Sequence, residues 1–192
     1  MQRILFLVLL LSSPLIFAQK ERGLPLNVSY LGHFSYQPGI KLGTDFILNE
    51  RIKEKERKGK TKNSAHAIVL QPQVAFFSSR GTHYSFLLNA DIGYRISHLT
   101  PAGFYHGFNL GLGALYQSHL TSVSTNLGSG EQTGKQYDRR LYFMPTINYE
   151  FGQYYNRVGW FSRFSSGWKF NPNKESSAVI FTEFGLRIYL KK

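Results

Sequence analysis

The sequence contains no cysteine, only 2 methionines and, after residue 18, no apolar run of membrane-helix length. Without cysteine the chain has no disulfide and no lipoprotein anchor. A membrane-spanning helix needs about 20 consecutive apolar residues, so an exported chain of this kind is either soluble or a closed β-barrel. Strand pairing and burial of side chains must therefore supply its stability.

The first residues predict export from the cytoplasm. Arg3 precedes an apolar run over 4–17, and the small residue Ala18 follows it. This order of a basic start, a short apolar core and a small residue is typical of a cleaved signal peptide. We therefore expect a signal peptide over 1–18, with cleavage near Ala18, and a single domain over 19–192.

The segment from Tyr84 to Ile96 alternates strictly between apolar and other side chains. Such alternation predicts a β-strand with two different faces. The polar face carries Asp91 and Arg95, whereas the apolar face has aromatic residues towards its ends. This arrangement is typical of a strand with lipid outside and a polar lumen inside.

The same alternation predicts seven further strands, over 26–36, 39–48, 65–77, 104–118, 141–151, 158–170 and 180–190. Gly32 weakens the first of these, which we include because bacterial single-chain barrels have an even number of strands. The sequence thus predicts an all-β protein, a single closed antiparallel up-and-down transmembrane β-barrel of about eight strands.

Two polar segments are predicted to be loops. The segment 121–138 is rich in Ser, Thr, Gly and Asn, and its flanks could extend the neighbouring strands, whereas 49–64 is strongly basic. The basic segment can be a solvated loop, or a patch for anionic lipid head groups or an acidic partner. Nucleic acid is not an expected partner of an exported chain, despite the net charge of +12.

Charged residues within the strands fall on the non-apolar face. Since an eight-stranded barrel is only wide enough to be filled by its own side chains, we expect them to form a lumen ion-pair network. A selective eyelet or a catalytic carboxylate is the alternative, but catalysis would need a cleft that a substrate can enter. The predicted network consists of Lys41, Asp45, Asp91, Arg95, Glu150, Arg163, Lys169, Glu183 and Arg187.

No motif in the sequence predicts a catalytic, metal or cofactor site. The 6 histidines lack metal-ligand spacing, and the glycines around Gly111 lie on an alternating strand, where they allow curvature. For a lipid-modifying enzyme, the best available set is His119 with Ser118, Ser122 and Ser124. A polar loop explains these residues better, because Ser- and Thr-rich loops are abundant in exported proteins, so we predict that the protein is not an enzyme.

An aromatic wall is predicted on the apolar face of the strand over 158–170. It consists of Trp160, Phe164, Trp168 and Phe170. Such a wall can face lipid or dock on another membrane protein.

Two segments carry a family resemblance. The closing segment 184–190 reads FGLRIYL, and 38–46 reads PGIKLGTDF. With the expected signal peptide and the alternating aromatic strands, they resemble small outer-membrane β-barrel proteins of Gram-negative bacteria. The segment 38–46 is similar to the first strand of members from Bacteroidota. The resemblance implies a location in the cell outer membrane but no particular activity, and Lys191 and Lys192 depart from the aromatic C-terminus that is common in such barrels.

The leading hypothesis is a non-enzymatic integral outer-membrane protein, either a structural element or an accessory subunit of a larger outer-membrane assembly. Its expected partners are outer-membrane lipid or another outer-membrane protein. A small porin-like pore or transport component is the alternative, and a lipid-modifying enzyme is the third. A soluble, lipocalin-like carrier would need the apolar faces of the strands to point inward.

Overall fold

The computed structural model describes residues 24–33, 37–57, 60–79, 83–100, 103–127, 130–155, 157–171 and 176–190. The predicted signal peptide over 1–18 lies outside these ranges, so it stays a prediction. Among the residues described, no helix has both the length and the apolar character needed to cross a membrane.

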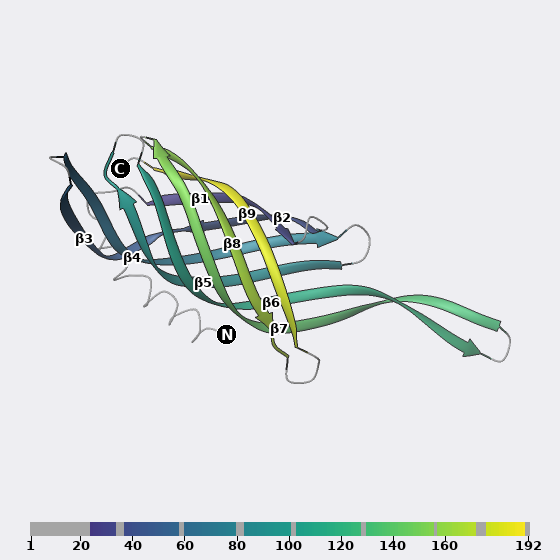
Figure 1. The fold of residues 1–192 in the computed structure, drawn as a ribbon. Coiled ribbons are helices and arrows are strands. Elements are labelled where there is room, and N and C mark those ends of the chain that lie inside the picture. Colours follow the sequence, from purple (N-terminus) through teal and green to yellow (C-terminus); the bar gives the residue numbers. More distant parts are fainter. Residues whose placement is uncertain are drawn as a thin grey trace, which may run out of the picture.

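The chain forms a closed antiparallel barrel (Figure 1). Its strands are β1 (Pro25–His33), β2 (Gln37–Thr44), β3 (Phe46–Arg57), β4 (Lys60–Ser79), β5 (His83–His98), β6 (Phe104–Leu127), β7 (Gly130–Tyr155), β8 (Val158–Lys169) and β9 (Ser177–Tyr189). The strands β4 to β9 pair in chain order, each with its neighbour in the sequence. β1 closes the barrel by pairing with both β9 and β2. The predicted first strand is confirmed as β1.

β2 and β3 are two parts of one barrel strand, because both pair with β4. The ladder stops at Gly43, opposite Gln73, and resumes at Phe46, opposite Leu70. Pro72 lies in the interval on β4, and its backbone has no N–H with which to continue the ladder. Counted in this way the barrel has eight strands, as the sequence predicts.

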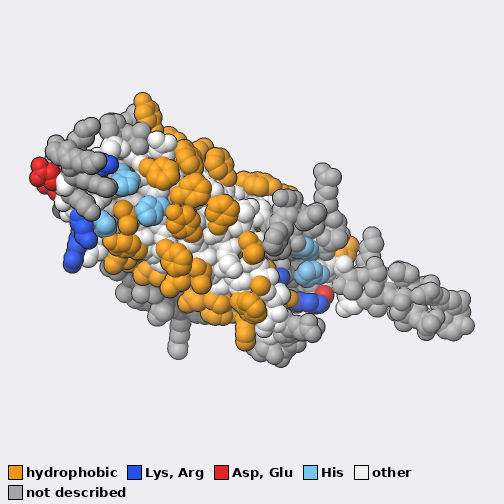
Figure 2. Space-filling model, viewed as in Figure 1, with side chains coloured by type: hydrophobic (Ala, Val, Ile, Leu, Met, Phe, Trp, Pro, Cys, Tyr) orange, Lys and Arg blue, Asp and Glu red, His pale blue; other side chains and the backbone are white. Residues whose placement is uncertain are grey.

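The two faces of each strand have opposite character. On β5, Leu88 is 55% exposed on the outer face, whereas Asp91 is fully buried in the lumen. Apolar side chains cover much of the outer surface in Figure 2. Since a soluble protein rarely exposes so continuous an apolar surface, this wall is suited to lipid. The lipocalin-like alternative is wrong, because it requires the apolar faces to point inward.

The two predicted loops are instead long β-hairpins. β6 and β7 pair without interruption out to Leu127 and Gly130, and β3 and β4 pair out to Arg57 and Lys60. Both segments are polar in composition, so they show no apolar alternation by which a strand could be recognised.

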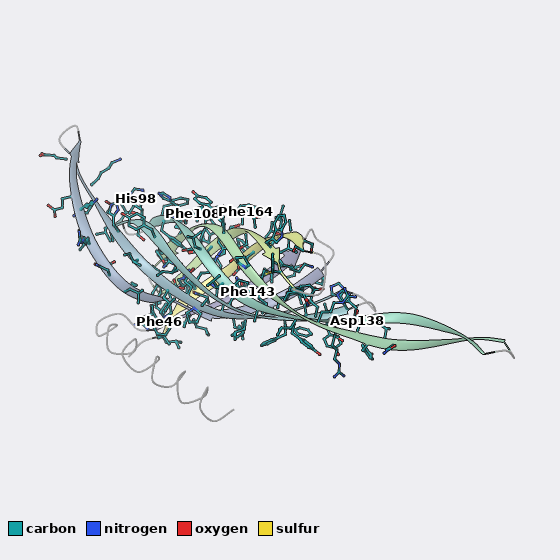
Figure 3. The ribbon with its side chains drawn as sticks, turned by 90° about the horizontal axis from the view of Figure 1, so that it is seen from below. Phe46, His98, Phe108, Asp138, Phe143 and Phe164 are labelled. Atoms are coloured by element: carbon teal, nitrogen blue, oxygen red, sulfur yellow. The ribbon has the colours of Figure 1, made fainter. Side chains whose placement is uncertain are left out.

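The two hairpins extend from opposite ends of the barrel (Figure 1). The β3–β4 extension lies at the end where the described chain starts and finishes, where the Leu190 N–H donates to the Leu24 carbonyl at 3.4 Å. The β6–β7 extension projects from the other end, and Figure 3 places Asp138 near its base and His98 towards the β3–β4 end.

Candidate functional site

Glu150, near the C-terminal end of β7, is the centre of a buried ion-pair network in the lumen. Its Oε1 accepts hydrogen bonds from Arg95 at 3.1 Å and from Arg187 at 3.0 Å. Its Oε2 accepts one from Arg163 Nε at 3.1 Å, and a terminal nitrogen of the same guanidinium also contacts this oxygen. Three strands thus bring three guanidinium groups to one carboxylate that is only 1% exposed.

Asp45 is the second acid among these arginines. Its Oδ2 lies 2.7 Å from Arg95 and 3.1 Å from Arg187, and its Oδ1 accepts hydrogen bonds from the Asn27 and Gln71 side chains. Asp45 occupies the break between β2 and β3. The interruption of the strand therefore lies beside the carboxylate that balances two buried arginines.

Arg163 joins this centre to a second group of charges. Its NH1 lies 3.3 Å from Asp91 and 3.8 Å from Glu183. Glu183 also accepts hydrogen bonds from Lys41 Nζ at 2.9 Å and from Ser29 Oγ at 2.6 Å. A single connected network therefore runs across the inside of the barrel.

The network contains equal numbers of opposite charges. Its cations are Lys41, Arg95, Arg163 and Arg187, and its acids are Asp45, Asp91, Glu150 and Glu183. Pairing is what makes their burial tolerable, because an isolated charge in such surroundings would be very costly. The structure thus brings together eight of the nine predicted residues.

Lys169, the ninth predicted residue, is not part of the network. It forms no ion pair with any residue that the structure describes, and its Nζ lies 5.6 Å from the centre of the Tyr142 ring. Lys169 is the last residue of β8, so it lies further along the barrel axis than the network does. Alternation predicts the face of a strand but not the level at which a side chain meets its partners.

Neutral polar side chains complete the network, and the sequence analysis did not identify them. Arg187 NH1 donates to the hydroxyl oxygens of Tyr105 at 2.6 Å and Tyr154 at 3.0 Å, and these two rings stack at 4.5 Å. Gln71 and Gln73 accept hydrogen bonds from Arg163 at 3.0 and 2.9 Å. Tyr105 could have been found, because it alternates with the outward Phe104.

Gly111 shows how closely the lumen is packed. A Cβ atom there would overlap Asp91 Oδ1 and Thr146 Oγ1, so no other residue fits without displacing the network. The prediction that the glycines of 104–118 leave room for larger neighbours agrees with this geometry.

An apolar cluster fills the half of the lumen towards the β6–β7 extension. It consists of Leu31, Ala75, Phe77, Leu87, Leu115, Tyr142, Met144, Val179 and Phe181. Alternation does not reveal this cluster, because each strand contributes only one or two apolar residues to its inward face. The cluster becomes visible only when the register between neighbouring strands is known.

Of the residues considered for a lipid-modifying enzyme, the two with described side chains, Ser118 and His119, do not form a catalytic pair. Ser118 and His119 are neighbours on β6, so their side chains point to opposite faces of the sheet. The His119 ring instead lies 4.9 Å from that of His83, near the end of the barrel. Burial lowers the pKa of His119, and Arg140 and Lys169 lower it further. The side chains of Ser122 and Ser124 lie outside the described part of the structure.

The lumen acids bear on metal binding. Within the described ranges, no group of three or more His, Asp or Glu side chains is placed to hold a metal ion. The four lumen acids all engage cationic side chains.

The predicted aromatic wall lies on the outer face of β8. Trp160 stacks on Phe184 at 6.2 Å between ring centres, and Phe164 stacks on Phe151 at 6.3 Å. Phe164 is labelled on the barrel body in Figure 3, and Phe170 is also exposed on this wall.

Trp168 borders an apolar groove of about 690 Å³ in the outer wall. The groove forms because some of the outward residues that line it are small. The groove is lined by Leu70, Ala90, Ile92, Leu110, Gly111, Leu112, Pro145, Thr146, Ile147, Ser166, Gly167 and Trp168.

The closed eight-stranded barrel, with its apolar outer wall and polar inner layer, defines the class of outer-membrane β-barrels. No protein-family model matches the chain, and no curated protein matches it.

Solved structures share the fold. The N-terminal β-barrel domain of Pseudomonas aeruginosa OprF is similar with a TM-score of 0.50 and 10% identity, over 88% of this chain and 98% of that one. Neisserial surface protein A (NspA) has a TM-score of 0.42 at 11% identity, over 87% and 94% of the two chains. The attachment invasion locus protein Ail of Yersinia pestis has 0.35 at 9%, over 88% and 100%. At these identities the likeness concerns the fold alone, and the predicted similarity to Bacteroidota members stays a prediction.

Proposed function

We propose that this protein is a non-conducting, non-enzymatic barrel of the outer membrane, serving as a structural element or as an accessory subunit of a larger outer-membrane assembly. The observation that supports this most is the charge-balanced network in the lumen. Glu150, Arg163 and Arg187 are buried at the level where a channel would have to pass.

A pore would require these pairs to separate. Removing one partner from a buried pair costs about 3 to 5 kcal/mol, because the remaining charge is left uncompensated. Glu150 alone holds three arginines, so opening a path at this level would break several such contacts together. The apolar cluster then adds a second filled level between the network and the β6–β7 end.

Planar bilayer recording tests the proposal. We expect the purified, folded protein to give no steady conductance, with the difference in gel mobility between unheated and boiled samples as the check of folding. The variant Glu150→Ala, which opens space and removes an acid, is the matched comparison for the sensitivity of the assay. Steady single-channel conductance from the wild-type protein would contradict the proposal and favour the pore.

A sealed lumen leaves the outer wall and the two rims as the surfaces for interaction. The groove beside Trp168 is an indentation in that wall, and it gives a second membrane protein a shape to recognise. Docking at this groove is the form of the accessory-subunit proposal that the geometry supports best.

A further inference from the structure

The β3–β4 extension has one basic face. The register places Arg51 opposite His66, Lys53 opposite Ser64 and Lys55 opposite Lys62. Directly opposed residues share a face of the sheet. We call this set the basic face, and among its described side chains, those of Arg51, Lys53, Lys62, Ser64 and His66, there is no acid.

The other face of the same ribbon carries the acids. Glu50 stands opposite Ala67, Glu54 opposite Asn63 and Glu56 opposite Thr61. The three glutamates are exposed, so this acidic face is open to solvent. The segment 50–56 reads ERIKEKE, and its basic and acidic residues therefore lie on opposite faces of the ribbon.

The basic face continues the outer wall of the barrel. His66 lies on the outer face of β4, where its Nδ1 is 2.5 Å from the Tyr94 hydroxyl, and Tyr94 is 47% exposed on the outer wall. The next outward residue of β4 on the barrel side is Ile68, which is exposed and apolar. Along this line the wall passes from apolar residues through a tyrosine and histidine belt to Lys62.

This order matches the layers of a bilayer from the hydrocarbon to the head groups. Aromatic residues prefer the interface, and Lys and Arg extend their charges to the phosphate level. Figure 2 shows charged side chains gathered at this end, beyond the apolar surface.

We propose that the basic face binds the phosphate groups of anionic phospholipids in the leaflet at the β3–β4 end of the barrel. Each Lys or Arg close to an anionic bilayer strengthens attachment about five-fold. The inference uses insertion of the barrel in a membrane but not the subunit role, so either can fail without the other.

Site-specific fluorescence tests the position of this face. Because the chain has no cysteine, Ser64→Cys on the basic face and Asn63→Cys on the opposite face each give one labelling site in the full-length protein. Both are labelled with bimane and reconstituted into vesicles containing phosphatidylglycerol with a nitroxide near the head group. We expect stronger quenching at residue 64 than at residue 63, and equal quenching would overturn the proposal.

Charge removal tests the chemistry. In the Ser64→Cys protein, nitroxide-labelled phosphatidylglycerol should associate about five-fold or more strongly than the matching phosphatidylcholine, and high salt should reduce the preference. Replacing Arg51, Lys53 and Lys62 with Gln should abolish it, whereas replacing Glu50, Glu54 and Glu56 with Gln should retain or increase it. If the labelled Ser64→Cys protein with its charges intact shows no preference, or if the two triple variants behave alike, lipid binding is overturned and an acidic protein becomes the better candidate partner.

Discussion

Glu150 is the residue on which the largest number of buried cations depends. Arg95, Arg163 and Arg187 all contact its carboxylate, and Asp45 is the only other acid that the structure places within ion-pair distance of Arg95 and Arg187 among the described residues. The network therefore has little redundancy at this point. A neutral replacement would leave more positive than negative charge in a space that excludes water.

We expect Glu150→Gln to lower the free energy of unfolding by about 3 to 5 kcal/mol, because one buried positive charge loses its balance while the size of the side chain hardly changes. Urea unfolding of the protein in detergent micelles, followed by gel mobility, measures the effect. Glu54→Gln is the matched control, since it makes the same change at an exposed position. A loss of less than about 1 kcal/mol, similar to that of the control, would show that the network does not stabilise the barrel.

The β6–β7 extension does not pair with the other strands of the barrel. β5 pairs with β6 only as far as His119, and β7 pairs with β8 over Thr146–Tyr155, with one further bridge at Phe143. Beyond His119 and Asp138, the described ladder of this hairpin joins β6 to β7 alone. Its backbone hydrogen bonds are local, so the barrel does not depend on them.

We therefore expect that replacing 121–136 with Asn-Gly leaves the unfolding midpoint within experimental error of the wild type, because the backbone pairing of this hairpin is between its own two strands. Urea unfolding monitored by gel mobility provides the comparison. Removing Ala114, Leu115, Tyr142 and Phe143 is the matched control, because it preserves the strand alternation but takes two residues from the apolar cluster. If both shortened proteins lose stability equally, the extension is part of the folding unit.

The elements also show where prediction from sequence succeeds and where it ends. Alternation identifies the strands and the face of each charge, because both follow from local backbone geometry. It fails at 49–64 and 121–138, where both faces of a ribbon are polar. It also cannot reveal that Leu87 and Phe181 belong to one cluster or that Lys169 lies away from the acids, because these depend on the stagger between strands.

At the scale of the whole molecule, three surfaces carry different chemistry. The lumen holds a charge-balanced ion-pair network, the outer wall is apolar, and the β3–β4 end presents opposite charges on two faces. Only the outer wall and the ends are accessible to another molecule. A barrel sealed as we propose acts on its surroundings through shape and charge at these surfaces, since a fold by itself does not define a function.

The groove in the outer wall gives the last prediction, which concerns assembly. Ser166 lines the groove, so Ser166→Phe should fill it while keeping the wall compatible with lipid. If the protein is an accessory subunit that docks there, a stoichiometric outer-membrane partner should co-purify with the wild type in mild detergent and be lost from this variant. Ala178→Phe adds the same ring at an exposed position of β9 that does not line the groove, and it should retain the partner. A barrel that purifies alone in all three forms would favour the structural element, because a filled groove changes nothing for a protein whose wall meets only lipid.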